Sequence, residues 1–204
     1  MVMTALDTYP VSVPLASKKI ILRPLVREDG TALARFFARM PADERIMLKD
    51  DVTNPVVIAN WCANIDVEKV LPILALDGSR IVGDATLHRD RRGWMRHVAN
   101  IRLTVDPEYR RIGLARAMVR ELLVLAERLG VAVVDAEMLS AQHGAVKLFE
   151  DLGFIAVATL PQHALDLMSQ PHDIVVMSKT LIPVEQLSPD AHKPTEEVDV
   201  GGAG

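Results

Sequence analysis

The sequence predicts a mixed α+β domain, in which helices pack on a central sheet. Short segments of alternating or continuous apolar residues recur along the chain and are typical of β-strands. Other segments repeat their apolar residues every three or four positions, as amphipathic helices do. Gly, Pro and Asn separate many of these segments, so we expect about seven strands and about four helices.

The length and composition are those of one globular domain. The chain has 204 residues, of which 50% are hydrophobic and 25% charged, and such a chain buries most of its apolar surface. We divide it into an N-terminal arm at residues 1–16, a domain at 17–182 and a disordered tail at 183–204. The tail is rich in Pro, Glu, Asp and Gly and has few large apolar residues.

Charge and cysteine content argue against several classes of protein. The net charge of −4 gives no support for general nucleic-acid binding. Cys62 is the only cysteine, so neither an intrachain disulfide nor a cysteine-built zinc site is expected. No stretch approaches the length of a membrane span, and no signal sequence is recognisable. We expect a cytoplasmic protein without a resident metal.

The first half of the chain is expected to form three strands with helices between the first and the second. Asn54 and Pro55 are typical of a helix start, with the proline in the first turn. Asp77-Gly78-Ser79 is typical of a hairpin turn. The expected strands are 19–25, 71–76 and 81–88, and the expected helices are 27–40, 56–62 and a short one that begins at 41.

The second half is expected to add four strands and two long helices. Gly130 and Gly153 follow the helical patterns and are typical of helix ends. The expected strands are 97–105, 131–139, 154–160 and 174–180, and the expected helices are 114–129 and 145–152.

The turn between strand 97–105 and helix 114–129 is the strongest functional signal. Gly113 has no Cβ and Ala115 has almost no side chain, so backbone N–H groups can approach an oxyanion directly. The helix N-terminus adds unpaired donors, and Arg110 and Arg111 add positive charge. These features predict a phosphate or pyrophosphate site. An ordinary strand-to-helix turn with solvated arginines is the alternative.

This turn resembles motif A of the GNAT superfamily, the Gcn5-related N-acetyltransferases. There is no Gly-Lys-Ser/Thr and only one glycine, which excludes a P-loop and a dinucleotide fingerprint. Arg110, Gly113 and Ala115 fill the fixed positions of the signature Arg/Gln-x-x-Gly-x-Gly/Ala. Residues 145–154 are similar to the family's Ala-x-x-Leu-Tyr-x-x-Leu-Gly-Phe. The resemblance covers roughly residues 17–181.

The resemblance implies a GNAT fold with a mixed, mostly antiparallel sheet, and acetyl-CoA as co-substrate. It implies that the strand through Leu103 and Val105 splays from its neighbour, so that the pantetheine arm pairs with its backbone. It also implies that the amides of residues 111–116 hold the pyrophosphate. The implied cofactor contacts are Leu103, Val105, Arg110, Arg111, Ile112, Gly113, Leu114, Ala115, Arg116, Gln142 and Phe149.

The sequence departs from the family pattern at the proton carriers. Phe149 stands where many relatives have a tyrosine that protonates the leaving thiolate, and Gln142 stands where asparagine is frequent. The first strand and helix also resemble Pat-like protein lysine acetyltransferases, which carry a glutamate base near Asn100. Asn100 can orient a water but cannot accept a proton at neutral pH.

Three residues are candidates for the catalytic proton transfer, and each has a structural alternative. Glu137 lies on an apolar strand, where a carboxylate is costly unless it is functional or sits in a salt bridge. His88 titrates in the useful range, although an exposed strand-end histidine is equally simple. Asn100 is the third, as a water-orienting residue. His172-Asp173 offers an oriented imidazole, but two loop residues make no triad.

The resemblance implies an N-acetyltransferase that moves the acetyl group directly from CoA to a primary amine. Cys62 lies far from motif A in the sequence, and no covalent nucleophile suggests itself. The acceptor is a protein lysine or N-terminus, or a small amine. An acyl-CoA-binding regulatory or catalytically impaired domain is the alternative, supported by Asn100 and Phe149. The apolar last strands fit either a homodimer or core packing.

Overall fold

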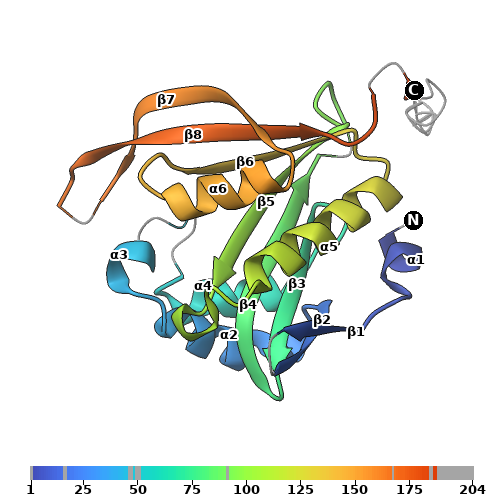
Figure 1. Ribbon diagram of the computed structural model, residues 1–204. Coiled ribbons are helices and arrows are strands. Elements are labelled where there is room, and N and C mark those ends of the chain that lie inside the picture. The colour runs from blue at the N-terminus through green and yellow to red at the C-terminus, as the bar shows by residue number, and fades with distance from the viewer. Residues whose placement is uncertain are drawn as a thin grey trace, which may run out of the picture.

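An eight-stranded sheet forms the centre of the protein (Figure 1). The computed structural model describes residues 2–15, 18–45, 48, 52–90, 92–166, 168–183 and 186–187. The strands are β1 (Val11–Leu15), β2 (Lys18–Pro24), β3 (Val70–Asp77), β4 (Arg80–Arg89), β5 (Val98–Val105), β6 (Val133–Leu139), β7 (Ile155–Leu165) and β8 (Pro171–Thr180). Their order is β1-β2-β3-β4-β5-β6-β8-β7. Only β5 and β6 pair in parallel among these strands, which confirms the mixed, mostly antiparallel sheet.

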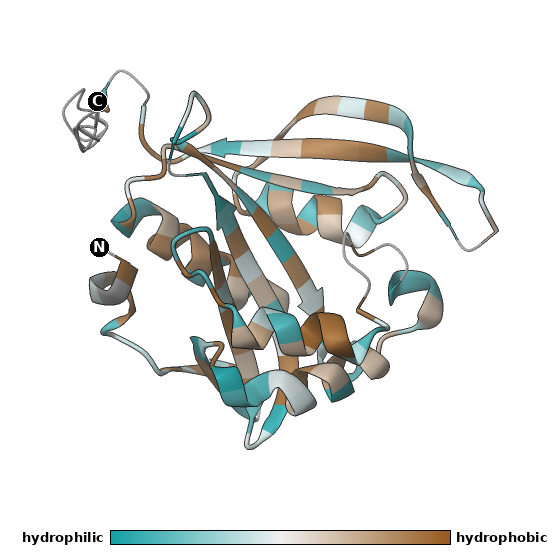
Figure 2. Ribbon diagram, turned by 180° about the vertical axis from the view of Figure 1, so that it is seen from behind, coloured by the Kyte–Doolittle hydropathy of each residue, from teal (hydrophilic) through white to brown (hydrophobic). Residues whose placement is uncertain are grey.

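Helices cover both faces of the sheet. They are α1 (Val2–Leu6), α2 (Gly30–Ala38), α3 (Ala42–Arg45), α4 (Pro55–Ala63), α5 (Leu114–Arg128) and α6 (His143–Asp151), and a 3-10 turn at Arg27–Asp29 precedes α2. Helix α5 connects the parallel strands β5 and β6 and lies in front of the sheet in Figure 1. Helices α2 and α4 lie on the opposite face, which Figure 2 shows from behind. The expected tail at 183–204 falls almost wholly outside the described residues.

The alternation of side chains along β4 and β5 divides the core into two parts. Leu87 and Ile101 are buried in the larger cluster, with the apolar face of α5. On the other face, Leu74 and Ile81 join Phe36 and other residues of α2 and α4 in a smaller cluster. A period of two along each strand produces these two faces, and the register shift between β3 and β4 at Ala75 and Leu76 interrupts the alternation, so that Ile81 and Leu87 lie on opposite faces.

Gly83 allows α5 to approach β4 closely. A Cβ at this position would lie 2.6 Å from Met118 Sδ of α5. A larger residue would therefore require the Met118 side chain to move from its present position.

The N-terminal arm contains two elements that the sequence analysis did not predict. Helix α1 and strand β1 occupy residues for which no helical period is visible. Val2 is fully buried in the larger core cluster, and Tyr9 Oη donates a hydrogen bond of 2.8 Å to Glu121 of α5. A helix of five residues is not stable alone, so its conformation depends on this packing rather than on its own sequence.

The C-terminal hairpin is longer than expected. Strand β7 continues past residue 160 to Leu165, through a register shift between Leu160 and Ala164. Pro161 is tolerated there because β7 is an edge strand. Ile155 and Val157 are 67% and 54% exposed on this edge, so core packing alone does not explain them. The homodimer stays a prediction.

We expect Val2→Asp to lower the free energy of unfolding by about 3 kcal/mol, because it places a carboxylate in the core. Val56→Asp is the matched control, since Val56 is 63% exposed in the first turn of α4. There the change should stay within about 0.5 kcal/mol. Urea unfolding of the two variants measures this difference, and equal effects would contradict the docking of α1.

Candidate functional site

The candidate site lies where β5 and β6 diverge. The two strands pair only from Val98 with Val133 to Ile101 with Ala136. Beyond this point β5 continues without β6, and Figure 1 shows the two strands running apart. The pairing of the sheet is therefore interrupted in its middle, beside the last residues of β5, and we refer to this interruption as the opening.

Backbone groups of β5 point into this opening. Asp106 N donates to Val82 O of β4 at 3.0 Å, and Thr104 lies opposite Asp84 in the same ladder. Because hydrogen-bonding positions alternate along an antiparallel strand, Leu103 and Val105 direct their N–H and C=O groups away from β4. The groups of Leu103 and the Val105 N–H face the opening and are available to an extended ligand, whereas Val105 O accepts a hydrogen bond from Arg110 Nε.

A loop of free amides follows the end of β5. Gly113 has a φ of +90° and Arg111 a φ of +61°, so the backbone turns sharply before α5 begins at Leu114. Within the described residues, the N–H groups of 111–116 donate to no carbonyl or side-chain oxygen. The side chains of Leu114 and Ile112 pack in the core. The loop thus presents main-chain donors at the positive end of a helix, as an anion site requires.

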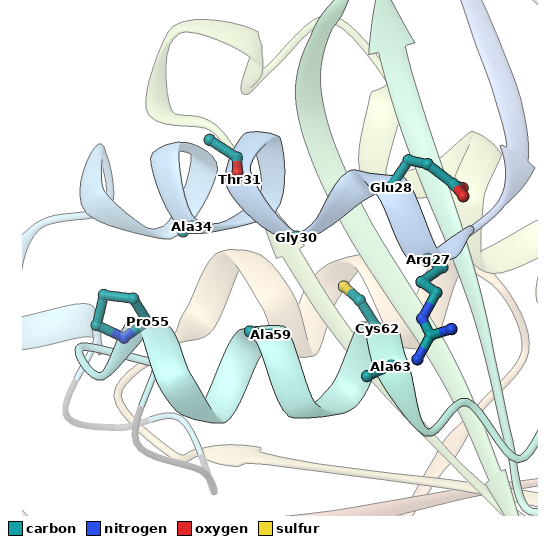
Figure 3. Close-up of a pocket in the computed structure, with 9 residues that line it drawn as sticks. All are labelled: Arg27, Glu28, Gly30, Thr31, Ala34, Pro55, Ala59, Cys62 and Ala63. Atoms are coloured by element: carbon teal, nitrogen blue, oxygen red, sulfur yellow. The ribbon is translucent and has the colours of Figure 1, made fainter.

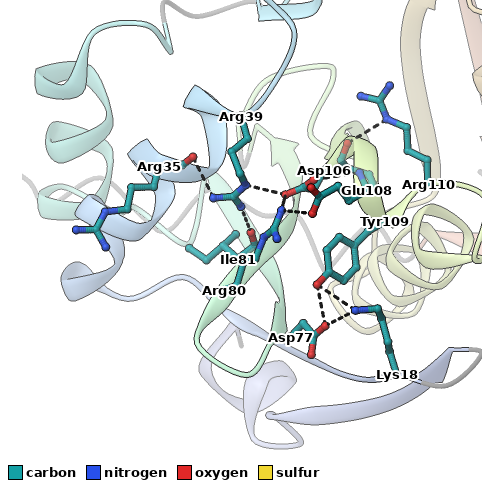
Figure 4. Close-up of polar contacts among 11 residues, drawn as sticks. Lys18, Arg35, Arg39, Asp77, Arg80, Ile81, Asp106, Glu108, Tyr109 and Arg110 are labelled. Carbon is teal, nitrogen blue, oxygen red and sulfur yellow. Dashed lines mark hydrogen bonds and ion pairs between the residues drawn. The ribbon is translucent and has the colours of Figure 1, made fainter.

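Ion pairs, two of them to a buried carboxylate, hold the start of this loop (Figure 4). Asp106 is 1% exposed and accepts hydrogen bonds from Nε of Arg39, which follows α2, at 2.8 Å and from Arg80 Nη2 of β4 at 2.9 Å. Burial by itself would raise the pKa of Asp106, but the two guanidinium groups outweigh it and lower this pKa. Tyr109 is buried and donates to Asp77 Oδ2 at 2.7 Å, which also pairs with Lys18.

Two arginines of the loop pair with neighbouring helices. Arg110 Nη1 donates to Glu44 Oε1 of α3 at 2.8 Å, and Arg110 Nε donates to Val105 O at 3.3 Å. Arg116 of α5 forms a salt bridge of 2.8 Å with Asp151 of α6. The loop is thereby joined to α3 on one side and to α6 on the other.

Gln142 and Phe149 belong to the α6 region beside the opening. Gln142 Oε1 accepts a hydrogen bond of 3.3 Å from Leu139 N at the end of β6. Phe149 is 5% exposed and packs edge-on against Phe154, with ring centroids 4.9 Å apart. Its ring is therefore mainly part of the core.

Two of the three catalytic candidates lie side by side on the sheet, on the face opposite α5. His88 of β4 is in register with Asn100 of β5, which is in register with Asp135 of β6. His88 Nε2 lies 2.8 Å from Thr86 Oγ1. Glu137 is exposed on β6, beyond the paired part of the two strands. The structure brings His88 and Asn100 together but leaves Glu137 on the other side of the opening.

Asp84 is a candidate that the sequence analysis missed. It lies on β4 opposite Thr104, is only partly exposed, and faces the side of the sheet that α2 and α4 cover. Burial raises the pKa of Asp84 to about 7. No described residue donates a hydrogen bond or ion pair to this carboxyl. The signal was present, since Asp84 is a carboxylate within an apolar strand, as Glu137 is.

A pocket of about 470 Å³ lies between α2 and α4 on the same side of the molecule (Figure 3). Small residues line much of it, and Cys62 is among them. Burial raises the pKa of the Cys62 thiol, and the carboxylates of Asp29 and Asp84 add to this effect. A protonated thiol is a poor nucleophile, which agrees with the expectation that no covalent intermediate forms on Cys62.

The pair His172-Asp173 does not form an oriented imidazole by itself. Both residues lie within β8, and His172 Nε2 is 3.0 Å from Asp166 Oδ2 instead. Asp173 accepts a hydrogen bond from Gln162 N. In the part of the chain that the structure describes, no group of three His, Cys, Asp or Glu could hold a metal. No described helix is long and apolar enough to cross a membrane.

We expect Asp84→Asn to stabilise the fold at pH 8 and to have little effect near pH 3.5. The raised pKa means that the folded state keeps a proton which the unfolded state loses between about pH 4 and 7. Stability of the wild type therefore falls as the pH rises, by at most about 4 kcal/mol, and Asn removes this loss. Urea unfolding at both pH values measures it.

The control for this experiment is Asp166→Asn. The hydrogen bond from His172 lowers the pKa of Asp166, which gives the opposite sign: the wild type gains stability above the unfolded pKa. A stabilising effect of the same size in both variants would show that the change at Asp84 is not due to its ionisation.

Known proteins are similar to this chain in sequence over part of its length and in fold over most of it. The chain is 33% identical over 76 residues to the [ribosomal protein bS18]-alanine N-acetyltransferase of Escherichia coli, a match that covers 37% of this chain and 51% of that protein. The chain thus matches about half the length of this curated relative. The GNAT domain of PAT from S. lividans is 17% identical, with a TM-score of 0.70 over 86% of this chain and 98% of that one.

A putative acetyltransferase from Salmonella typhimurium, solved with acetyl-CoA, is 20% identical with a TM-score of 0.68. It covers 84% of this chain, and 98% of its own length is matched. Such likenesses establish the fold. The model of the acetyltransferase (GNAT) family matches residues 31–154, which is more than half of the chain. The chain therefore belongs to the GNAT acetyltransferase family.

Proposed function

We propose that the protein is an acetyl-CoA-dependent N-acetyltransferase that transfers the acetyl group directly to a primary amine. The observation that carries this proposal is the opening between β5 and β6, which leads into the loop of free amides at 111–116. An extended arm of a ligand fits the opening, and an anionic group at the end of that arm fits the loop of free amides. Family membership supports acetyl-CoA as the ligand.

The pantetheine arm pairs with the backbone of Leu103 and Val105 as an additional strand would, since these groups face the opening. The pyrophosphate accepts hydrogen bonds from the amides of 111–116 at the N-terminus of α5. A main-chain N–H near Val105 polarises the thioester carbonyl and stabilises the oxyanion that forms when the amine attacks. The Asp106 ion pairs fix this part of the chain before the ligand arrives.

The acceptor that we favour is the α-amine of a protein N-terminus. The curated relative is an alanine N-acetyltransferase of a ribosomal protein, and this supports a protein acceptor over a small molecule. Polar side chains on β4 and β5 face the acceptor side, including Thr86 and Thr104. A protein lysine and a free amino acid are the competing acceptors in the experiment below.

An acyl-CoA-binding regulatory domain is the second candidate. Phe149 favours it, because this ring is buried against Phe154 and has no hydroxyl to protonate the thiolate. Binding of acetyl-CoA is expected from both candidates, whereas turnover is expected only from the enzyme.

We expect acetyl-CoA to bind and free CoA thiol to appear only when an amine acceptor is present. Calorimetry measures the binding, and a thiol reagent measures the release with an N-terminal alanine peptide, its N-terminally blocked lysine analogue and free amino acids. Binding without release from any acceptor would favour the regulatory domain. Absence of binding would contradict the proposed ligand.

We expect Gly113→Asp to weaken acetyl-CoA binding by at least about 100-fold, since a carboxylate would repel the pyrophosphate and the left-handed backbone disfavours a Cβ. Gly93→Asp is the control, because Gly93 also has a positive φ of +79° but lies in the β4–β5 turn with open space around it. Both variants carry the same charge change. Equal calorimetric affinities of the two would contradict the placement of the pyrophosphate.

A further inference from the structure

We propose that Asp84 takes the proton from the acceptor amine, through a water held beside the Thr104 hydroxyl. This inference rests on the proposed acetyltransferase function. It assigns the proton transfer to a residue of β4, rather than to His88, Asn100 or Glu137.

The position of Asp84 is the first argument. Asp84 is paired with Thr104, which lies between Leu103 and Val105, the two residues whose backbone faces the opening. Paired residues in this ladder have Cα atoms about 5.5 Å apart, so the Asp84 carboxyl lies one strand from the reacting thioester. A ligand strand beyond β5 adds about 4.8 Å, so the Asp84 side chain and a water beside Thr104 together span the distance to the acceptor amine, an accepted route for general base catalysis.

The other candidates are farther away along the strands. His88 is four residues beyond Asp84 on β4, and its partner Asn100 is four residues before Thr104 on β5. At about 3.3 Å per residue, this places both about 13 Å from the row of Asp84 and Thr104.

The surroundings of Asp84 are the second argument. Leu74 flanks it from β3, Thr104 from β5, and Thr86 lies two residues on along β4. The titratable groups near it are Cys62 of α4, whose thiol is protonated, and Asp29.

Asp29 does not compete for the proton, because Arg23 neutralises it through two hydrogen bonds of 2.7 Å. Arg102 lies two residues before Thr104 on β5 and is paired with Thr86. The described residues thus offer Asp84 no ion pair that would keep its carboxylate charged and weakly basic.

The proton and electron balance is complete without another reactant. The ammonium group of the acceptor gives one proton through the water to the Asp84 carboxylate, and the neutral amine forms a bond to the thioester carbon. The carbon–sulfur bond breaks, and the second proton of the amine passes to the departing thiolate. Asp84 then releases its proton to solvent.

The basicity of Asp84 favours an acceptor of low pKa. A carboxyl that titrates at about 7 lies within about one unit of an α-amine but more than three units below a lysine side chain. Forming the neutral amine is therefore roughly 100-fold or more easier for an α-amine. The basicity of Asp84 thus supports the α-amine of a protein N-terminus as the acetyl acceptor.

The decisive experiment compares Asp84→Asn with the wild type and with Asp166→Asn, a carboxylate change on the distant hairpin. We expect Asp84→Asn to lower kcat at least about 100-fold without changing the calorimetric affinity for acetyl-CoA. The rise of kcat/KM with an apparent pKa near 7 should disappear in this variant. Asp166→Asn should keep the wild-type kcat and the rise of kcat/KM with pH.

The outcomes separate the two proposals. A wild type that turns over while Asp84→Asn stays within threefold, with the same pH profile, would overturn the role of Asp84 alone. A wild type without turnover on any acceptor would overturn the acetyltransferase function and this inference with it. If Asp84→Asn lost acetyl-CoA binding, Asp84→Glu would decide: retained binding with a displaced pH profile supports the inference, and an unchanged profile overturns it.

Discussion

The brief parallel pairing of β5 and β6 is the constraint on which the rest of the structure depends. Four residue pairs join the two strands, and then they separate. Unpaired backbone in the middle of a sheet is costly, because its polar groups lose their partners. Here the unpaired groups are those of Leu103 and the Val105 N–H, because Val105 O accepts a hydrogen bond from Arg110 Nε, so the cost is confined to the end of β5.

The ion pairs of Asp106 compensate for this local loss of pairing. Arg39 directly follows α2 and Arg80 begins β4, so a single buried carboxylate joins the two to the loop that follows β5. Breaking a buried pair by removing one partner is strongly destabilising. These ion pairs therefore fix the start of the loop that leads to the amides of 111–116.

The pKa of Asp84 is shifted in the opposite direction to that of Asp106. Asp106 is buried with two guanidinium partners and its pKa is lowered, whereas Asp84 has no such partner among the described residues and its pKa is raised. The first arrangement stabilises the fold, and the second weakens it as the pH rises from about 4 to 7. A carboxyl that is kept at such a cost is typical of a functional residue.

The sequence alone determined the class of the fold, most of the strands and helices, and the loop around Gly113, because each depends on residues that are neighbours in the chain. It did not indicate α1, whose helix is stable only through the burial of Val2. The pairing of Arg39 with Asp106 spans 67 positions and leaves no local pattern. The pKa of Asp84 likewise depends on strands and helices packed around it. Only the tertiary structure decides such properties, since burial and partner choice are set by contacts between distant segments.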